Sequence, residues 1–119
     1  MRTMKHTHFY SLPEDTNINT VDWDSISRYQ KLSEEFIAKY ADKVGWNGIS
    51  SRQELSEKFI TQYADKVDWY GISHYQKLSE KFIDQHADKV DWNGISRYQK
   101  LSEEFRAKHK LDVLDTRRS

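Results

Sequence analysis

Basic and aromatic side chains recur in this chain at a spacing of 23 residues, in positions that vary among four near-copies of one segment. Arginine and tyrosine are favoured at protein interfaces, where each buries a large surface and makes directional polar contacts. The same residue types suit a phosphate backbone whose bases stack on aromatic rings. The candidate partner-binding residues, here called the stripe, are Arg28, Tyr29, Lys31, Arg52, His74, Tyr75, Lys77, Arg97, Tyr98 and Lys100.

Three interpretations of the stripe remain open from the sequence. It is a solvated helix face with half-packed tyrosines, a protein-binding face, or a nucleic-acid-binding face. The neighbouring acidic column, which begins with Glu34, is interpreted as helix-start chemistry. Because a surface with both signs of charge suits a protein better than a polyanion, we prefer a protein partner to nucleic acid.

Other chemistries are not indicated. The chain has no cysteine, which excludes disulfides and thiolate sites. His6 and His8 lack a third ligand at a metal-binding spacing, and His86 and His109 share a column with tyrosines, so both pairs are interpreted as non-ligating. The sequence shows no Ser–His–acid arrangement and no glycine-rich phosphate loop. We therefore predict a protein without catalytic activity, cofactor or metal.

The elements that must position the stripe are the four copies themselves, residues 21–43, 44–66, 67–89 and 90–112. Nine columns are the same in all four. Most are apolar, and the others are polar types that cap helices or satisfy buried backbone groups, which is typical of a structural framework. In the first copy these columns are Val21, Trp23, Ile26, Ser27, Gln30, Leu32, Ser33, Glu34 and Phe36.

The apolar spacing within a copy is helical, and no stretch alternates as a strand does. Ser33 and Asp22 are placed to cap helix N-termini, which predicts two short helices over roughly 23–30 and 34–42. A competing register treats Ser27 and Gln30 as a capping box, with the glycines of later copies, such as Gly48, forming a preceding turn. That register predicts one longer helix per copy, from about residue 28 to 42.

A single copy has too few apolar columns to offset the entropy of ordering its backbone. Stacking lets each copy bury its apolar residues against the next, as in other repeat proteins. We interpret the recurring tryptophan as a packing residue between copies. The predicted fold is all-α, a small α-solenoid of four tandem 23-residue helical repeats with an N-terminal cap.

The ends of such a stack need covering. Residues 1–20 are predicted to form an N-terminal arm or cap, with Phe9, Tyr10 and Leu12 against the first repeat. In the fourth copy Arg106 replaces an isoleucine, a polar change that suits a C-terminal cap and therefore a monomer. Residues 113–119 are predicted to be a frayed tail.

The composition indicates which partners and which cellular compartment to expect. Lys and Arg number 19, and Asp and Glu also number 19, so no overall field attracts nucleic acid or an anionic membrane. No apolar run approaches the roughly 20 residues of a membrane span, and the N-terminus lacks the apolar core of a secretory signal. We expect a cytoplasmic protein that does not bind membranes.

The string W-x-x-I-S-x-x-Q-x-L-S-E-x-F-I, followed by "ADKVDW", resembles a short helical repeat found in uncharacterised proteins of bacteriophages, bacteria and giant viruses. The resemblance covers residues 21–112, with departures at Gly45, Glu54 and in the last half-copy. It implies no enzymatic activity. Its viral setting implies a phage protein that inhibits a host defence system, such as an anti-CRISPR protein that blocks a Cas nuclease in the host cytoplasm.

Overall fold

The computed structural model describes residues 8–111, and within this range all regular structure is helical. The predicted C-terminal tail, residues 113–119, lies outside the described residues, as do residues 1–7 of the predicted N-terminal arm and therefore His6. A short 3-10 helix, η1 (Ile18–Thr20), precedes the repeats. The α-helices are α1 (Trp23–Tyr29), α2 (Glu34–Lys39), α3 (Trp46–Arg52), α4 (Glu57–Gln62), α5 (Trp69–Tyr75), α6 (Glu80–Gln85), α7 (Trp92–Tyr98) and α8 (Glu103–Lys108).

The two-helix prediction for each copy is confirmed by the caps. The Oγ of Ser33 accepts a hydrogen bond from the Phe36 N–H at 3.0 Å, and the Asp22 carboxylate accepts from Ser25 N–H at 3.1 Å. The second helix ends at Lys39 rather than near residue 42, because the Lys43 and Val44 N–H groups turn back to the Tyr40 carbonyl.

The competing one-helix register is wrong. Ser27 lies inside α1, and its Oγ donates to the Trp23 carbonyl at 2.6 Å instead of capping a helix. Gly48 lies inside α3 rather than in a turn before a helix.

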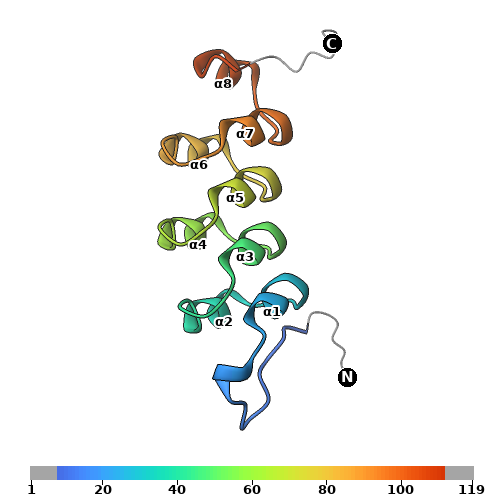
Figure 1. The fold of residues 1–119 in the computed structure, drawn as a ribbon. Helices are drawn as coiled ribbons and strands as arrows, with labels where there is room; N and C mark the ends of the chain where they lie inside the picture. Colours follow the sequence, from blue (N-terminus) through green and yellow to red (C-terminus); the bar gives the residue numbers. More distant parts are fainter. Residues whose placement is uncertain (1–7, 112–119) are drawn as a thin grey trace, which may run out of the picture.

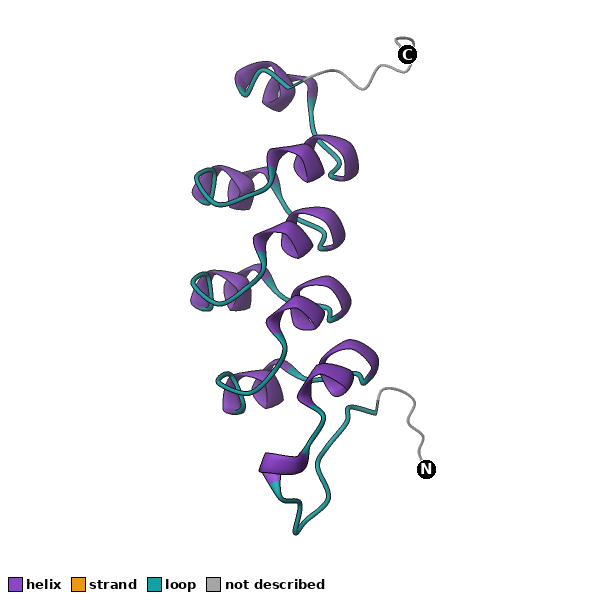
Figure 2. Ribbon diagram, viewed as in Figure 1, coloured by secondary structure: helices purple, strands orange, loops and turns teal. Residues whose placement is uncertain are grey.

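The helices form two parallel columns, with α1, α3, α5 and α7 in one and α2, α4, α6 and α8 in the other (Figures 1 and 2). Successive repeats pack through the first column, where α1 contacts α3, α3 contacts α5 and α5 contacts α7. The radius of gyration is 17.2 Å, against roughly 13–14 Å for a compact domain of this length. The predicted α-solenoid is therefore the observed architecture.

Glycines allow this close packing. A Cβ at Gly71 of α5 would lie 3.1 Å from the Cβ of Ser50 on α3. A Cβ at Gly48 would lie 2.9 Å from the Arg28 side chain, and one at Gly94 would overlap the His74 ring. The first repeat has Ser25 at this position, and no repeat precedes it. The glycine column is thus required by contact between helices, not by a turn.

The interior is a line of isoleucines, two from each joint between repeats. These side chains are fully buried: Ile37, Ile49, Ile60, Ile72, Ile83 and Ile95. The tryptophans of repeats 2 to 4 contact both their own repeat, by ring stacking, and the repeat before, through the indole N–H, so they do pack between copies as predicted. Trp46 lies 5.5 Å from the Tyr63 ring and 6.5 Å from the Phe59 ring between centroids.

A glutamine of each later repeat joins it to the repeat before. The Nε2 of Gln53 donates to the carbonyls of Ser27 at 2.9 Å and Gln30 at 2.7 Å, and its Oε1 accepts from the Leu32 N–H at 2.9 Å. Gln76 and Gln99 repeat the same three bonds one and two repeats later. All three side chains are buried. Because buried backbone groups left unpaired cost stability, this ladder fixes how the repeats are aligned.

Three other constant columns also bond across each joint. The Ser27 Oγ accepts from Gly45 N–H at 2.9 Å, and the Trp46 Nε1 donates to the Ala41 carbonyl at 2.9 Å. The Glu34 carboxylate accepts from both the N–H and the hydroxyl of Ser56, at 2.6 and 3.1 Å. The acidic column therefore links repeats in addition to lying at a helix start.

At each end of the stack, another residue makes a hydrogen bond equivalent to one that joins two repeats. At the N-terminus the Trp23 Nε1 donates to the Ile18 carbonyl at 3.1 Å, as Trp46 does to Ala41. The Tyr10 ring meets the Phe36 ring edge-on, at 5.9 Å between centroids. At the C-terminus the Arg106 Nη2 donates to the Ser96 carbonyl at 2.8 Å, taking the place of a next-repeat glutamine.

Within residues 8–111 every helix is too short and too polar to cross a bilayer.

Candidate functional site

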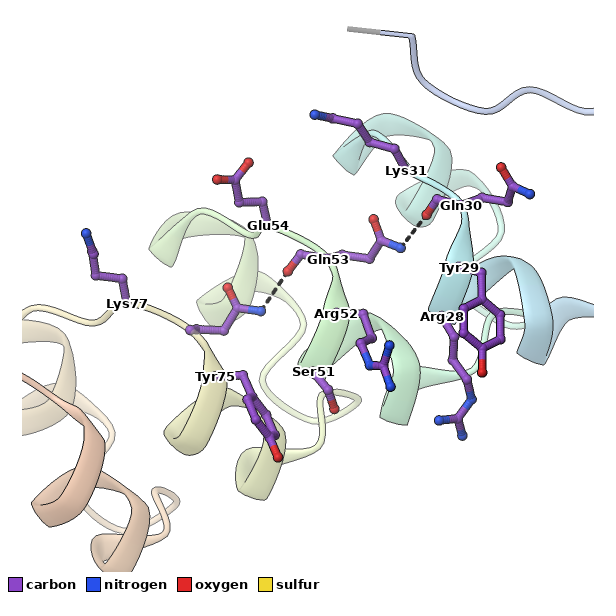
Figure 3. A pocket seen from close by; sticks show the side chains of 11 residues that line it. Arg28, Tyr29, Gln30, Lys31, Ser51, Arg52, Gln53, Glu54, Tyr75 and Lys77 are labelled. Carbon is purple, nitrogen blue, oxygen red and sulfur yellow. Dashed lines mark hydrogen bonds between the residues drawn. The ribbon is translucent and has the colours of Figure 1, made fainter.

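Six of the ten stripe residues line one open trough of about 500 Å³ across the first three repeats (Figure 3). Residues of α1, α3 and α5 and of the loops that follow them form its lining. The lining residues are Arg28, Tyr29, Gln30, Lys31, Ser51, Arg52, Gln53, Glu54, Tyr75, Gln76 and Lys77.

The glutamine ladder runs along the middle of the trough. Figure 3 shows Gln53 between two sets of outward-pointing side chains, with its amide bonded to Gln30. Because the amides of Gln53 and Gln76 are committed to backbone partners, they supply a rigid floor rather than groups free to bind a ligand. The stack therefore positions the trough through its most constant column.

One side of the trough, the arginine–tyrosine side, carries Arg28, Tyr29, Arg52 and Tyr75 together with Ser51 (Figure 3). Tyr29 and Tyr75 are 70% and 64% exposed, so their rings are available to a partner. The Arg52 guanidinium lies 5.9 Å from the Tyr29 ring centroid, in the range of a cation–π contact. The Arg28 side chain lies 3.6 Å from the Asp24 carboxylate.

The trough is centred on the repeat that has a small residue, Ser51, in its variable column. The equivalent residues are Arg28, His74 and Arg97, all larger. The Ser51 hydroxyl donates to the Asn47 carbonyl of its own helix at 2.9 Å, so this short side chain lines the trough without filling it. The small side chain leaves space between Tyr29 and Tyr75.

The other side of the trough, the lysine side, carries Lys31, Glu54 and Lys77 (Figure 3). These are the same column in three successive repeats, and all three are exposed. The Lys31 Nζ lies 5.5 Å from the Phe9 ring centroid, so the N-terminal segment borders the trough. The lining contains four Lys or Arg side chains and one carboxylate, that of Glu54.

Four predicted stripe residues do not line the trough. Arg97, Tyr98 and Lys100 belong to the fourth repeat, and each is exposed. The His74 side chain is only 8% exposed and bonds the Asp91 carboxylate at 2.8 Å. It also stacks on Tyr70, with 3.9 Å between ring centroids. The His74 side chain is therefore engaged by Asp91 and Tyr70 rather than exposed to a partner.

Five lining residues are not among the predicted stripe residues. Gln30, Gln53 and Gln76 belong to a constant column, which the sequence pattern indicates is structural. Ser51 and Glu54 lie in the variable columns, but neither is basic or aromatic. Their departure from the other repeats was the available signal.

His86 and His109 join repeats 2, 3 and 4 on the α4–α6–α8 column. His86 Nε2 lies 3.0 Å from the Thr61 hydroxyl, and His109 Nε2 lies 2.7 Å from the Asp84 carboxylate. The Lys108 Nζ contacts the same carboxylate at 3.0 Å. Hydrogen bonds from Lys108 and then His109 lower the pKa of Asp84.

Taken together, the trough is a rigid, exposed surface that can bind a chain through charge and aromatic contact.

Comparison with protein-family models, with curated proteins and with solved structures finds no match for this chain.

Proposed function

We propose that this chain is a non-enzymatic binding module whose trough docks a segment of another protein. The observation that supports this most is the alternation of exposed Tyr29, Arg52 and Tyr75 along a floor of committed glutamines. Tyrosine and arginine contribute most strongly at interfaces when they stand on a rigid support, because less entropy is lost on binding. The exposed Tyr98 and Lys100 extend the same chemistry to the fourth repeat.

A second candidate function is binding of single-stranded nucleic acid. The excess of cations in the trough, beside two exposed tyrosine rings, favours it. Phosphate binding weakens steeply with added salt because counterions are released on association. A protein contact through tyrosine and a few charges depends less on salt.

The narrower form of the proposal is that the chain is a phage inhibitor of a host defence system such as a CRISPR–Cas nuclease. It depends on the resemblance of the repeat to phage and giant-virus repeats, and no trough residue favours a Cas protein over another protein partner. Its test is direct binding to a purified Cas nuclease of the same host, with loss of DNA cleavage.

The general proposal is tested by affinity capture from lysate of the cell that carries the gene, with and without nuclease. The matched control bait is Ser51→Arg, which places in the trough the residue that two other repeats carry at this position. We expect one stoichiometric protein on the wild-type bait, retained after nuclease treatment and lost from the control bait. Recovery that depends on nucleic acid supports the second candidate, and equal recovery on both baits contradicts a role for the trough.

A further inference from the structure

We propose that the trough selects a partner segment whose charges run acidic, basic, acidic, and that Glu54 is the residue that makes this selection. The inference rests on the proposed protein-binding function and names the class of partner. It arises from the one place where the lysine side of the trough changes sign.

Glu54 is an exception within its column. Lys31, Lys77 and Lys100 occupy the equivalent positions of the other repeats, so the trough presents a carboxylate between two ammonium groups. The stack does not require this carboxylate. Within residues 8–111 the Glu54 side chain is exposed, and none of the hydrogen bonds or ion pairs found there involves it.

The charge order on the lysine side has a defined complement. A partner carboxylate suits Lys31 and another suits Lys77, whereas a partner lysine or arginine suits Glu54. Like charges placed opposite one another disfavour the wrong partner, which is how charge pattern gives specificity. A uniform polyanion, including single-stranded nucleic acid, places a negative charge against Glu54, between Lys31 and Lys77 on the lysine side of the trough.

The arginine–tyrosine side sets where the segment passes. The space left by Ser51 lies between Tyr29 and Tyr75 and beside the Arg52 guanidinium. A chain lying there contacts both tyrosine rings and has the lysine side along its other edge. Ser51 therefore governs whether the trough is open, and Glu54 governs which charge order it accepts.

The test uses the full chain, two trough variants and one control. Glu54→Lys and Ser51→Arg each introduce a residue that other repeats carry at that position, so the stack tolerates them. Glu104→Lys is the control, because it is the same charge reversal at an exposed α8 position where repeats 2 and 3 have Lys58 and Lys81.

The probes are fluorescein-labelled synthetic peptides in one glycine–serine host, with three charged positions at varied spacing, and a thymidine oligonucleotide. The charge orders are Glu–Lys–Glu, Glu–Glu–Glu and Lys–Glu–Lys, and binding is read by fluorescence anisotropy. We expect the wild-type chain and Glu104→Lys to prefer Glu–Lys–Glu. Glu54→Lys should shift preference toward Glu–Glu–Glu and the oligonucleotide by about two- to fivefold, the size of exposed charge pairs.

Several results overturn the inference. The inference fails if the wild-type chain prefers Glu–Glu–Glu, Lys–Glu–Lys or the oligonucleotide. It also fails if every peptide binds the Ser51→Arg variant as tightly as it binds the wild-type chain. It also fails if Glu54→Lys and Glu104→Lys behave alike. The two proposals fail separately: a captured protein that is lost on Ser51→Arg but unaffected by Glu54→Lys keeps the binding function and rejects the charge order.

Discussion

The side-chain amide nitrogen of Gln53 lies 2.7 Å from the main-chain carbonyl oxygen of Gln30, its counterpart one repeat earlier. Gln76 makes the same bond to Gln53, and Gln99 makes it to Gln76, so the glutamines form a ladder along the stack. The ladder ends at Gln30, whose own side chain is exposed because no repeat precedes it. The glutamine side chains thus bond to the preceding repeat in three repeats and do not in the first.

Replacing Gln76 with leucine should therefore destabilise the protein, while the same change at Gln30 should not. Gln76→Leu leaves the Ser50 and Gln53 carbonyls and the Leu55 N–H unpaired in a buried joint. We expect a loss of about 2–4 kcal/mol in the free energy of unfolding. Gln30→Leu should change it by less than about 0.5 kcal/mol. Urea denaturation of both variants measures the difference, and equal losses would show that the ladder is not stabilising.

Gly94→Ala should destabilise the joint between the third and fourth repeats. An added Cβ would overlap the His74 ring, which is held by Asp91 and stacked on Tyr70. The expected cost is about 1–3 kcal/mol, although alanine is the better helix former.

His74→Ser provides a test of that cause, because it copies the Ser51–Gly71 pair of the previous joint. In the His74→Ser background Gly94→Ala should cost clearly less, as measured by a double-mutant cycle of thermal unfolding. Ser25→Ala, at the equivalent position of the first repeat, is the control and should be near neutral. An unchanged cost in the double mutant rejects the steric explanation.

Arg106→Ile should make the protein associate end to end. The change restores the isoleucine of the other repeats and removes the hydrogen bond to the Ser96 carbonyl, so an apolar face with an unpaired acceptor is left at the C-terminus. Light scattering should show a molar mass that rises with concentration for the variant and stays at one chain for the wild type. A variant that remains a single chain at every concentration would contradict the capping role of Arg106.

Acid should weaken the joint between the third and fourth repeats through Asp84. Its pKa is lowered in the folded protein by hydrogen bonds from Lys108 and His109, so this contribution is present above the unfolded pKa, about 4. It is lost as pH falls through the lowered folded pKa. Between about pH 5 and 2 the urea midpoint of Asp84→Asn should fall less than that of the wild type. Asp65→Asn is the control, and identical slopes for all three chains would contradict the assignment.

The sequence was sufficient to predict the fold because its signals are local and repeated. Ser33 caps a helix by bonding a residue three positions later, and the apolar period is visible within one copy. The glutamine ladder could not be predicted, since Gln53 bonds residues 21 to 26 positions away and its partners are main-chain atoms. Its constancy was visible, but its geometry was not.

The candidate site was predictable in part for the same reason. Arg28, Tyr29 and Lys31 follow from the rule that variable columns face outward. His74 does not line the trough, because its side chain contacts Asp91 of the next repeat and Tyr70, and the sequence gives no signal of either contact. The trough itself depends on Ser51 being small, which becomes informative only when its neighbours in space are known.

The fully buried isoleucines of this protein lie where neighbouring repeats meet, so one repeat alone should not fold. The most direct measurement is the far-ultraviolet circular dichroism of a synthetic peptide spanning residues 44–66, compared with the full chain. We predict that the peptide is largely unfolded in buffer and that the full chain is helical. A peptide that is monomeric and as helical as the full chain would contradict the account.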